Sequence, residues 1–313
     1  MAGHRIGPHS LYGSPHRVRD EVPPVPSGIV LPIPSVSVCI PVRNGERFVA
    51  ETIRSVLDQT YRDLELVVLD NASTDDTGTV ARSFADSRVR VERTTSPLAL
   101  PDNWNRAVQL TRAPLVKLLC ADDLLHPRCL ELQVGPMEAD PGLAVVAGRR
   151  HMIDEQSRVI VPRRGLSGLV GVRTGVEVAR RVVRLGTNPI GEGCNVLFRR
   201  EDFVAAGGWR AERQHIMDLD LWMRLLQYGE FLGLPETVAA FRITGGSISG
   251  ENGGRIDEEL RTLTRELGES SLFQVRGIDA VVGRVFGPVG RARRRALFAV
   301  SRGSSRRKER VDA

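Results

Sequence analysis

The chain has 313 residues, of which 41% are hydrophobic, enough to bury one large α/β core or one core with a small appended subdomain. This composition excludes collagen-like, coiled-coil and disordered classes for most of the chain. The net charge of +6 is unevenly placed: from Arg284 onward the balance is +8, so the preceding residues sum to −2. A slightly acidic body argues against a nucleic-acid-binding domain, because phosphate neutralisation needs a basic face on the folded part.

No run of about 18 uncharged apolar residues occurs, and the first residues lack the apolar stretch of a signal peptide. The cysteines, Cys39, Cys120, Cys129 and Cys194, have neither the spacing of a zinc site nor the density of a disulfide scaffold. We therefore expect buried free thiols and a cytoplasmic protein.

Residues 1–34 are rich in proline without a sustained period, which predicts a disordered segment. Order is expected to begin with the β-rich run 36–41, which ends at Pro41 and leads into a turn. Apolar residues then recur at Val49, Ile53, Val56 and Leu57, the stripe of a helix.

Strands and helices alternate after this point. We expect strands at 64–69, 89–91 and 115–119 and helices at 75–84 and 104–110. Such alternation predicts a mostly parallel sheet with helices on both faces, in which ligands bind beyond the carboxyl ends of the strands. Polar clusters follow three of these ends, at 41–46, 70–75 and 122–123.

The second half is less regular. It contains a strand near 144–147, a Gly- and Arg-rich stretch at 163–175, and helical patterns near 176–185, 217–227 and 256–267.

Asp122 and Asp123 are two adjacent carboxylates at the rim of the predicted sheet. Such carboxylates repel each other unless a cation lies between them. Mg²⁺ and Mn²⁺ prefer oxygen ligands and commonly combine one or two carboxylates with substrate phosphates. The alternative is a turn in which an aspartate caps the following helix.

The second strand ends at Asp70, which a helix-opening run of small polar residues follows. Capping accounts for Ser73, Thr74 and Asp75. Asp70 instead has the position of a carboxylate that accepts hydrogen bonds from a base or ribose. The other side of the same crevice is expected to consist of Pro41, Arg43, Asn44 and Glu46.

A further pair of aspartates, Asp218 and Asp220, lies on an amphipathic helix and points to different sides of it. Asp220 can pair with Arg224 at i+4, which leaves Asp218 without an evident cationic partner. A partly desolvated carboxylate of this kind has a raised pKa and is suited to accept a proton from a hydroxyl. The alternative is that both aspartates cap the start of the helix.

Together these motifs resemble the family 2 inverting glycosyltransferases of GT-A fold. The resemblance covers about residues 35–249 and rests on several motifs in the right order. They are Ser-Val-Leu-Asp-Gln-Thr-Tyr, Val-Leu-Asp-Asn-Ala-Ser-Thr-Asp, Asn-Trp-Asn-Arg-Ala, Ala-Asp-Asp-x-x-x-Pro and Asp-x-Asp-Leu-Trp.

The resemblance implies transfer of a sugar from a nucleoside-diphosphate sugar, with UDP-sugar favoured, in one displacement with inversion. Asp122 and Asp123 would contact the ribose and the pyrophosphate bound by Mn²⁺ or Mg²⁺, and Asp218 would be the base. The donor would lie near Pro41, Arg43, Asn44, Glu46, Asp70 and Asn71, flanked by Asn105 and Lys117. The acceptor, a sugar, a lipid-linked compound or a small molecule, would lie near Trp209 and Asp220, where Trp209 either stacks on a sugar or packs in the core. His215 is a further candidate for acceptor contact because it is close to Asp218 in the sequence.

The family pattern is not complete in this chain. Asn71 and Cys120 replace usual carboxylates, Met217 stands where Glu often precedes the base, and Thr244 stands where a His is common. A glycan-binding protein that kept the fold and lost activity therefore remains an alternative. A nucleotidyltransferase is a third interpretation, but it would require a Gly-rich phosphate loop after the first strand.

We divide the chain into a donor-binding half at 35–125, an acceptor-binding half at 126–250 and a helical extension with a basic tail at 251–313. The tail mixes arginines with Val285, Phe286, Leu297 and Phe298. It is interpreted either as a solvated disordered end or as a segment that lies on an anionic membrane.

Overall fold

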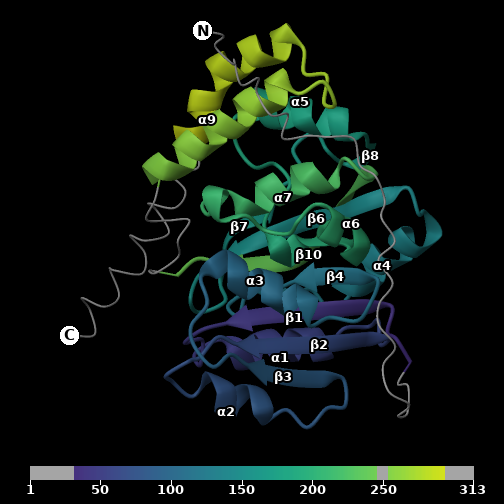
Figure 1. The fold of residues 1–313 in the computed structure, drawn as a ribbon, viewed down its shortest axis with the longest axis vertical. Coiled ribbons are helices and arrows are strands. Elements are labelled where there is room, and N and C mark those ends of the chain that lie inside the picture. The colour runs from purple at the N-terminus through teal and green to yellow at the C-terminus, as the bar shows by residue number, and fades with distance from the viewer. Residues whose placement is uncertain (1–31, 245–252, 293–313) are drawn as a thin grey trace, which may run out of the picture.

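The computed structural model describes residues 32–244 and 253–292, whose strands form one mixed sheet (Figure 1). Its strand order is β3-β2-β1-β4-β9-β6-β10-β5, with β7 paired to β6 and β8 paired to β10. The strands are β1 (Val36–Val42), β2 (Leu64–Asp70), β3 (Val89–Arg93), β4 (Leu115–Leu118), β5 (Leu124–Leu125), β6 (Leu143–Ile153), β7 (Val159–Arg164), β8 (Gly171–Arg173), β9 (Val196–Arg199) and β10 (Glu230–Arg242).

The strands of the first half run parallel, as the alternating pattern predicts. β1 pairs with β2 and β4, and β2 pairs with β3, all in parallel register. In the second half β9 runs antiparallel between β4 and β6, whereas β10 is parallel to β6. The predicted α/β class with a mostly parallel sheet is therefore confirmed.

Helices cover both faces of the sheet. They are α1 (Val49–Leu57), α2 (Thr77–Arg82), α3 (Leu100–Gln109), α4 (Cys129–Ala139), α5 (Gly175–Leu185), α6 (Arg200–Ala205), α7 (Met217–Leu225) and α9 (Gly253–Glu269). The sheet residues alternate between two clusters: Val38 and Ile40 belong to the one that contains residues of α1 and α4, and Cys39 belongs to the one that contains residues of α3, α7 and α9. This period of two is the pleat of a strand buried on both sides.

Several boundaries differ from the predicted ones. α3 begins at Leu100, before the expected start near residue 104, because Pro101 fits the first helical turn, where a backbone N–H is not needed. β6 continues past residue 147 to Ile153, where it pairs with β7 and β10. The prediction did not include α4, β9 and β10, whose limits depend on pairing between distant segments.

The helical extension belongs to the main core. Leu260, Leu263 and Leu267 of α9 are buried in the same cluster as α5 and α7. A further helix at residues 277–292, called the C-terminal helix below, follows α9. In Figure 1, α5 and α9 lie at the opposite end of the molecule from α2 and β3. The proposed boundary near residue 250 and the tail beyond residue 292 lie outside the described residues, as do residues 1–31 of the predicted disordered segment.

All four cysteines are free, as predicted, and Cys39, Cys129 and Cys194 are buried. Among the helices of the described residues, none combines the length and apolar character needed to cross a membrane.

Candidate active site

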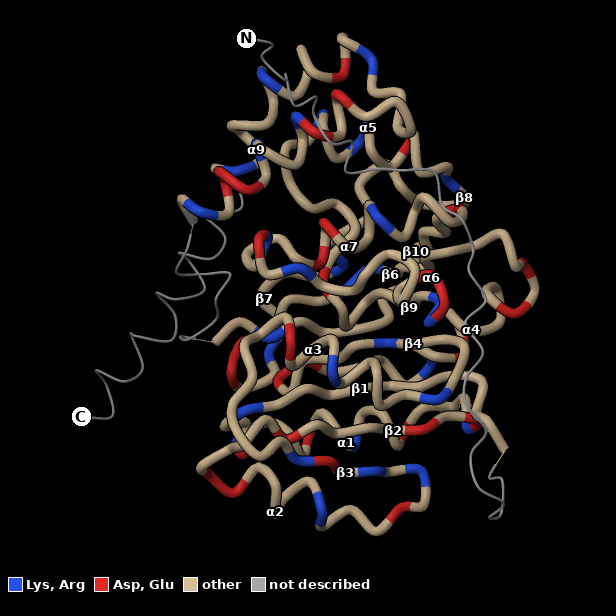
Figure 2. The backbone as a smooth tube through the Cα atoms, in the orientation of Figure 1, with Lys and Arg blue, Asp and Glu red and all other residues tan. Residues whose placement is uncertain are grey.

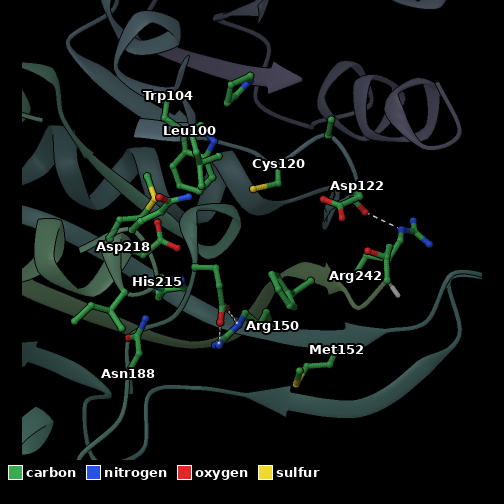
Figure 3. Close-up of a pocket in the computed structure, with 18 of the residues that line it drawn as sticks. Leu100, Trp104, Cys120, Asp122, Arg150, Met152, Asn188, His215, Asp218 and Arg242 are labelled. Carbon is green, nitrogen blue, oxygen red and sulfur yellow. Dashed lines mark hydrogen bonds and ion pairs between the residues drawn. The ribbon is translucent and has the colours of Figure 1, made fainter. Parts of the chain in front are cut away.

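A cavity of about 630 Å³ opens beyond the carboxyl ends of the parallel strands (Figure 3). The turn after β1, the loop after β4 and the start of α7 contribute Arg43, Asp122 and Asp218 to its wall. α3 and α9 add apolar side chains from the face where they pack together with α7. The cavity therefore joins both halves of the chain at the place where α/β sheets bind ligands.

The turn after β1 is tied to the turn after β2. Asn44 adopts a left-handed conformation, with φ of 52°, and its Oδ1 accepts a hydrogen bond from the Thr74 N–H at 2.9 Å. The Gly45 N–H donates to Thr77 Oγ1 at 2.8 Å. These bonds hold Pro41, Arg43 and Asn44 at the cavity wall, where the sequence placed them.

Three other predicted donor-side residues build these turns and do not line the cavity. Glu46 accepts a hydrogen bond from the Asp76 N–H at 2.9 Å. Asp70 is fully buried, accepts from the Ser73 N–H at 2.9 Å and pairs with Arg93. Asn71 Oδ1 accepts from the Leu98 N–H at 2.8 Å.

The loop after β4 brings Cys120, Asp122 and Asp123 together, with potential ligand atoms within 4.8 Å of one another. One oxygen of the fully buried Asp123 accepts the Arg242 N–H at 2.8 Å, and the other is buried and makes no hydrogen bond of normal geometry, although the carboxylate also interacts with the Cys194 side chain. Burial, and for Asp123 also the neighbouring charge of Asp122, raises the pKa of both carboxyls. A buried carboxylate oxygen that lacks a hydrogen bond of normal geometry fits a cation ligand, so these residues suit the divalent ion that the resemblance implies.

Arg242 of β10 fixes the backbone of this loop. Its Nε donates to the Asp122 carbonyl oxygen at 2.7 Å, the contact drawn in Figure 3, and its guanidinium lies 4.5 Å from the centre of the Phe48 ring. The side chain is buried and also pairs with Glu51 of α1. A strand from the second half thus positions the carboxylates of the first half.

Asp218 projects into the cavity from the first turn of α7 (Figure 3). Desolvation, and then the negative charge of Glu192, raise its pKa to about 8 against opposing effects of Arg150 and Trp209. Its Oδ1 is buried and makes no hydrogen bond of normal geometry. A carboxylate that is poorly solvated and faces a cavity has a high proton affinity, so its ionised form can accept a proton from a hydroxyl.

Arg150 and Glu192 form an ion pair in the cavity wall beside Asp218, although the sequence analysis did not select them. Arg150 Nη2 donates to Glu192 Oε1 at 2.8 Å, and a second contact joins Arg150 Nε to the same carboxylate. The arginine side chain is buried, whereas that of Glu192 remains 27% exposed. The sequence signal for this site is a single carboxylate between glycines, Gly191-Glu192-Gly193, after a turn.

The cavity wall also includes α9, whose helix was predicted near 256–267 but whose place at the cavity was not. Ile256 and Leu260 line the cavity together with Leu100 and Trp104 of α3. His215, a predicted acceptor-side residue, lines the cavity too, and its Nδ1 lies 2.6 Å from Glu259 Oε1 on α9. This contact ties α9 to the segment that precedes α7.

Four predicted residues lie away from the cavity. Lys117 is fully buried and donates to the carbonyl oxygens of Cys194 and Val196, each at 2.9 Å, so it joins β4 to the segment before β9 instead of flanking the cavity. The Asn105 side-chain amide donates to the Trp209 carbonyl oxygen at 2.9 Å and accepts the Trp209 N–H at 2.8 Å.

Trp209 and Asp220 are buried, and Trp209 also interacts with the carboxyl of Asp218, whose pKa it lowers. Trp209 is 2% exposed and meets Trp104 edge to face at 5.3 Å, which supports the core alternative over stacking on a sugar. Asp220 Oδ2 accepts from Arg224 Nε at 2.9 Å, as the i+4 spacing predicted, and Arg213 lies 3.1 Å from its other oxygen.

Comparisons with known proteins show which family this chain belongs to. A family model described as Glycosyl transferase family 2 matches residues 37–205, more than half of the chain. Among curated proteins, Uncharacterized protein MT1568 of Mycobacterium tuberculosis is 30% identical over 67% of this chain and 68% of its own. Putative glycosyltransferase EpsE of Bacillus subtilis is 28% identical over 63% of this chain and 68% of its own.

Solved structures show the same fold at low identity. TarS 1–349 of S. aureus in complex with UDP-GlcNAc superposes with a TM-score of 0.61 at 15% identity, covering 80% of this chain and 71% of that one. Mannosyltransferase PcManGT from Pyrobaculum calidifontis, in complex with GDP-Man and Mn²⁺, gives 0.60 at 17% identity, covering 87% and 75%.

Proposed function

Because the chain belongs to glycosyltransferase family 2, we propose that it transfers a sugar from a nucleoside-diphosphate donor to an acceptor hydroxyl with inversion. The observation that carries the proposal is the cavity in which Asp122 and Asp218, from different halves of the chain, face the same space. UDP-sugar is the favoured donor. TarS was solved with UDP-GlcNAc and PcManGT with GDP-Man, so nucleoside-diphosphate sugars are the class to test.

The diphosphate side of the donor belongs next to Asp122, and the nucleoside belongs against Pro41, Arg43 and Asn44. With Asp122 and Asp123 as protein ligands, a bound Mn²⁺ or Mg²⁺ would neutralise charge on the leaving diphosphate. Arg242 holds both aspartates, because its side chain donates to the Asp122 carbonyl oxygen and its backbone N–H donates to the Asp123 carboxylate.

The acceptor hydroxyl would lie against Asp218. In one step its oxygen forms a bond to the anomeric carbon, the bond from that carbon to the diphosphate breaks, and the hydroxyl proton passes to Asp218. Attack opposite the leaving group inverts the anomeric centre. Leu100, Trp104, Ile256 and Leu260 give this side of the cavity an apolar wall, which suits the apolar part of a lipid-linked or small-molecule acceptor as well as a sugar face. The free cysteines are consistent with a reducing, cytoplasmic compartment.

The proposal is tested by the activity of Asp218→Asn with a panel of nucleoside-diphosphate sugars and Mn²⁺. Asparagine keeps the shape but cannot take the proton, so sugar transfer and donor hydrolysis should fall by about 10²–10⁴-fold while donor binding persists. Asp58→Asn, an exposed carboxylate at the end of α1, is the matched control and should retain full activity.

Failure of the wild-type protein to bind or turn over any donor would favour the alternative of a glycan-binding protein that kept only the fold. Equal activity of Asp218→Asn and Asp58→Asn would remove Asp218 from the role of base.

A further inference from the structure

The C-terminal helix presents its apolar side chains to solvent. Its exposed stripe consists of Ile278, Val281, Val285, Phe286 and Val289, each between 52% and 64% exposed. At the helical angle of about 100° per residue these positions fall within one arc of the surface. A surface helix of a globular protein ordinarily turns such an arc toward the core.

Small residues on the opposite arc hold the helix in this orientation. A Cβ added at Gly283 would clash with the Val183 carbonyl oxygen, and one at Gly290 would lie 2.7 Å from that of Leu185. The backbone of the helix therefore packs directly on the end of α5. Rotation that buried the exposed stripe would force larger side chains into this contact, which the close backbone approach does not permit.

A buried ion pair fixes the same orientation. Asp279 is fully buried, and its carboxylate lies 2.5 Å from Arg184 Nη2 and accepts the Arg276 N–H at 3.0 Å. Rotating the helix would break the pairing of a buried charge, which is strongly unfavourable. The outward direction of the apolar side chains is thus a property of the packed structure.

Basic residues accompany the exposed stripe. Arg276 and Arg284 are exposed, whereas the Arg291 guanidinium lies on the packed side of the helix, near Gly186 and Gly287. The one acidic residue of 276–295 is Asp279, which is already paired. Figure 2 shows further Lys or Arg positions on α5 at the same end of the molecule. An apolar arc flanked by arginines complements a bilayer with anionic headgroups.

We propose that the C-terminal helix docks the protein on an anionic lipid surface, with the exposed stripe placed among the headgroups and the arginines on lipid phosphates. The proposal does not depend on the sugar-transfer chemistry. It selects the membrane interpretation of the basic C-terminal region over a solvated end, and it assigns the contact to side chains of a folded helix.

The test is sedimentation of the full chain with vesicles of phosphatidylglycerol and phosphatidylcholine in equal parts, or of phosphatidylcholine alone. We expect binding to the anionic vesicles, weakened by high salt, and little binding to the neutral ones. Val285→Asp combined with Val289→Asp should reduce partitioning at least about tenfold, because charged side chains would have to enter the apolar boundary.

Val204→Asp is the matched control, because Val204 is as exposed as Val289, at 64%, but lies on α6. It should bind vesicles like the wild type. As a second readout, Val289→Trp should show a blue shift of its fluorescence on adding anionic vesicles, whereas Val204→Trp should not.

Absence of wild-type binding to anionic vesicles, or equal binding by the double variant and Val204→Asp, would overturn the proposal. It would also be overturned by a dimer in solution that the double variant converts to monomers while vesicle binding is absent, since the exposed stripe would then be a contact between two copies of the chain.

Discussion

At the scale of single residues, the pKa of Asp218 depends on the ion pair beside it. Glu192 raises this pKa and Arg150 lowers it, so their pairing sets how much proton affinity the carboxylate has. A base with a pKa of about 8 is largely protonated at neutral pH in the ligand-free enzyme, which predicts that transfer rises with pH through this region.

Glu192→Gln should therefore move the acid limb of the pH profile of kcat/KM to lower pH. The substitution removes a negative charge that favours the protonated form and leaves Arg150 free to act on Asp218, and both changes lower its pKa. Initial rates measured across the pH range with a saturating metal concentration give the profile. Glu201→Gln, an exposed residue on α6, should leave the limb in place, and an unshifted limb in Glu192→Gln would contradict the assignment.

Asp218 also predicts how stability depends on pH. Its pKa is about 8 in the folded state and near 3.8 when unfolded, so the folded state retains a proton that the unfolded chain releases between these values. The contribution of this carboxyl to the free energy of unfolding is therefore fully present below about pH 4 and is lost as the pH rises to about 8. In Asp218→Asn this contribution to the slope disappears, so the stability of the variant should fall less than that of the wild type as the pH rises from about 4 to about 8. Urea unfolding in the absence of metal tests this, and identical slopes for the two proteins would refute it.

At the scale of elements, the packing of α9 shows that the segment after residue 250 is part of the main core. Its residues Leu260, Leu263 and Leu267 share one cluster with α5 and α7, and its Ile256 lines the cavity. Because the apolar stripe of α9 is buried in this shared core, we expect α9 to unfold together with the sheet.

Leu263→Ala should lower the free energy of unfolding by about 2–5 kcal/mol, because a fully buried side chain is replaced by a cavity. The transition should remain single in both far-UV and near-UV circular dichroism. Leu272→Ala, at a position that is 38% exposed, should change stability by less than about 0.5 kcal/mol. A separate early transition confined to helical signal would show instead that α9 unfolds independently.

At the scale of the whole molecule, the two halves share both core clusters and the contacts that hold the loop of Asp122 and Asp123. Both core clusters contain strands from each half, and Arg242 of β10 donates its N–H to Asp123 across 119 positions of sequence. A ligand at Asp122 and Asp123 should consequently stabilise the chain as one unit.

Mn²⁺ with a nucleoside diphosphate should raise the melting temperature in a single transition, with stabilisation of about 2.7 kcal/mol when ligand is present at a hundred times its Kd. EDTA should reverse the shift. Asp123→Asn removes a charge from the buried pair, so it should fold well without metal and lose the metal-dependent shift. A metal-dependent shift of wild-type size in Asp123→Asn would argue against this carboxylate as a ligand.

The sequence by itself determined the alternating half of the fold, and it located Pro41, Arg43, Asn44, Asp122, His215 and Asp218, which the structure brings to one cavity. These features are local: the period of a strand or helix and the polar residues at its end lie within a few positions of each other.

Only the tertiary structure decided which side chains face the cavity and which support it. Lys117 and Trp209 are residue types that often line binding sites, but here they lie in the core. Arg150, Glu192 and α9 reach the cavity through contacts between segments that are distant in the sequence. The outward orientation of the apolar stripe is of the same kind, because it follows from glycine contacts with α5 that no local pattern reveals. The burial and the charge pairing of a side chain depend on which distant segments are in contact, and these contacts are defined only in the complete fold.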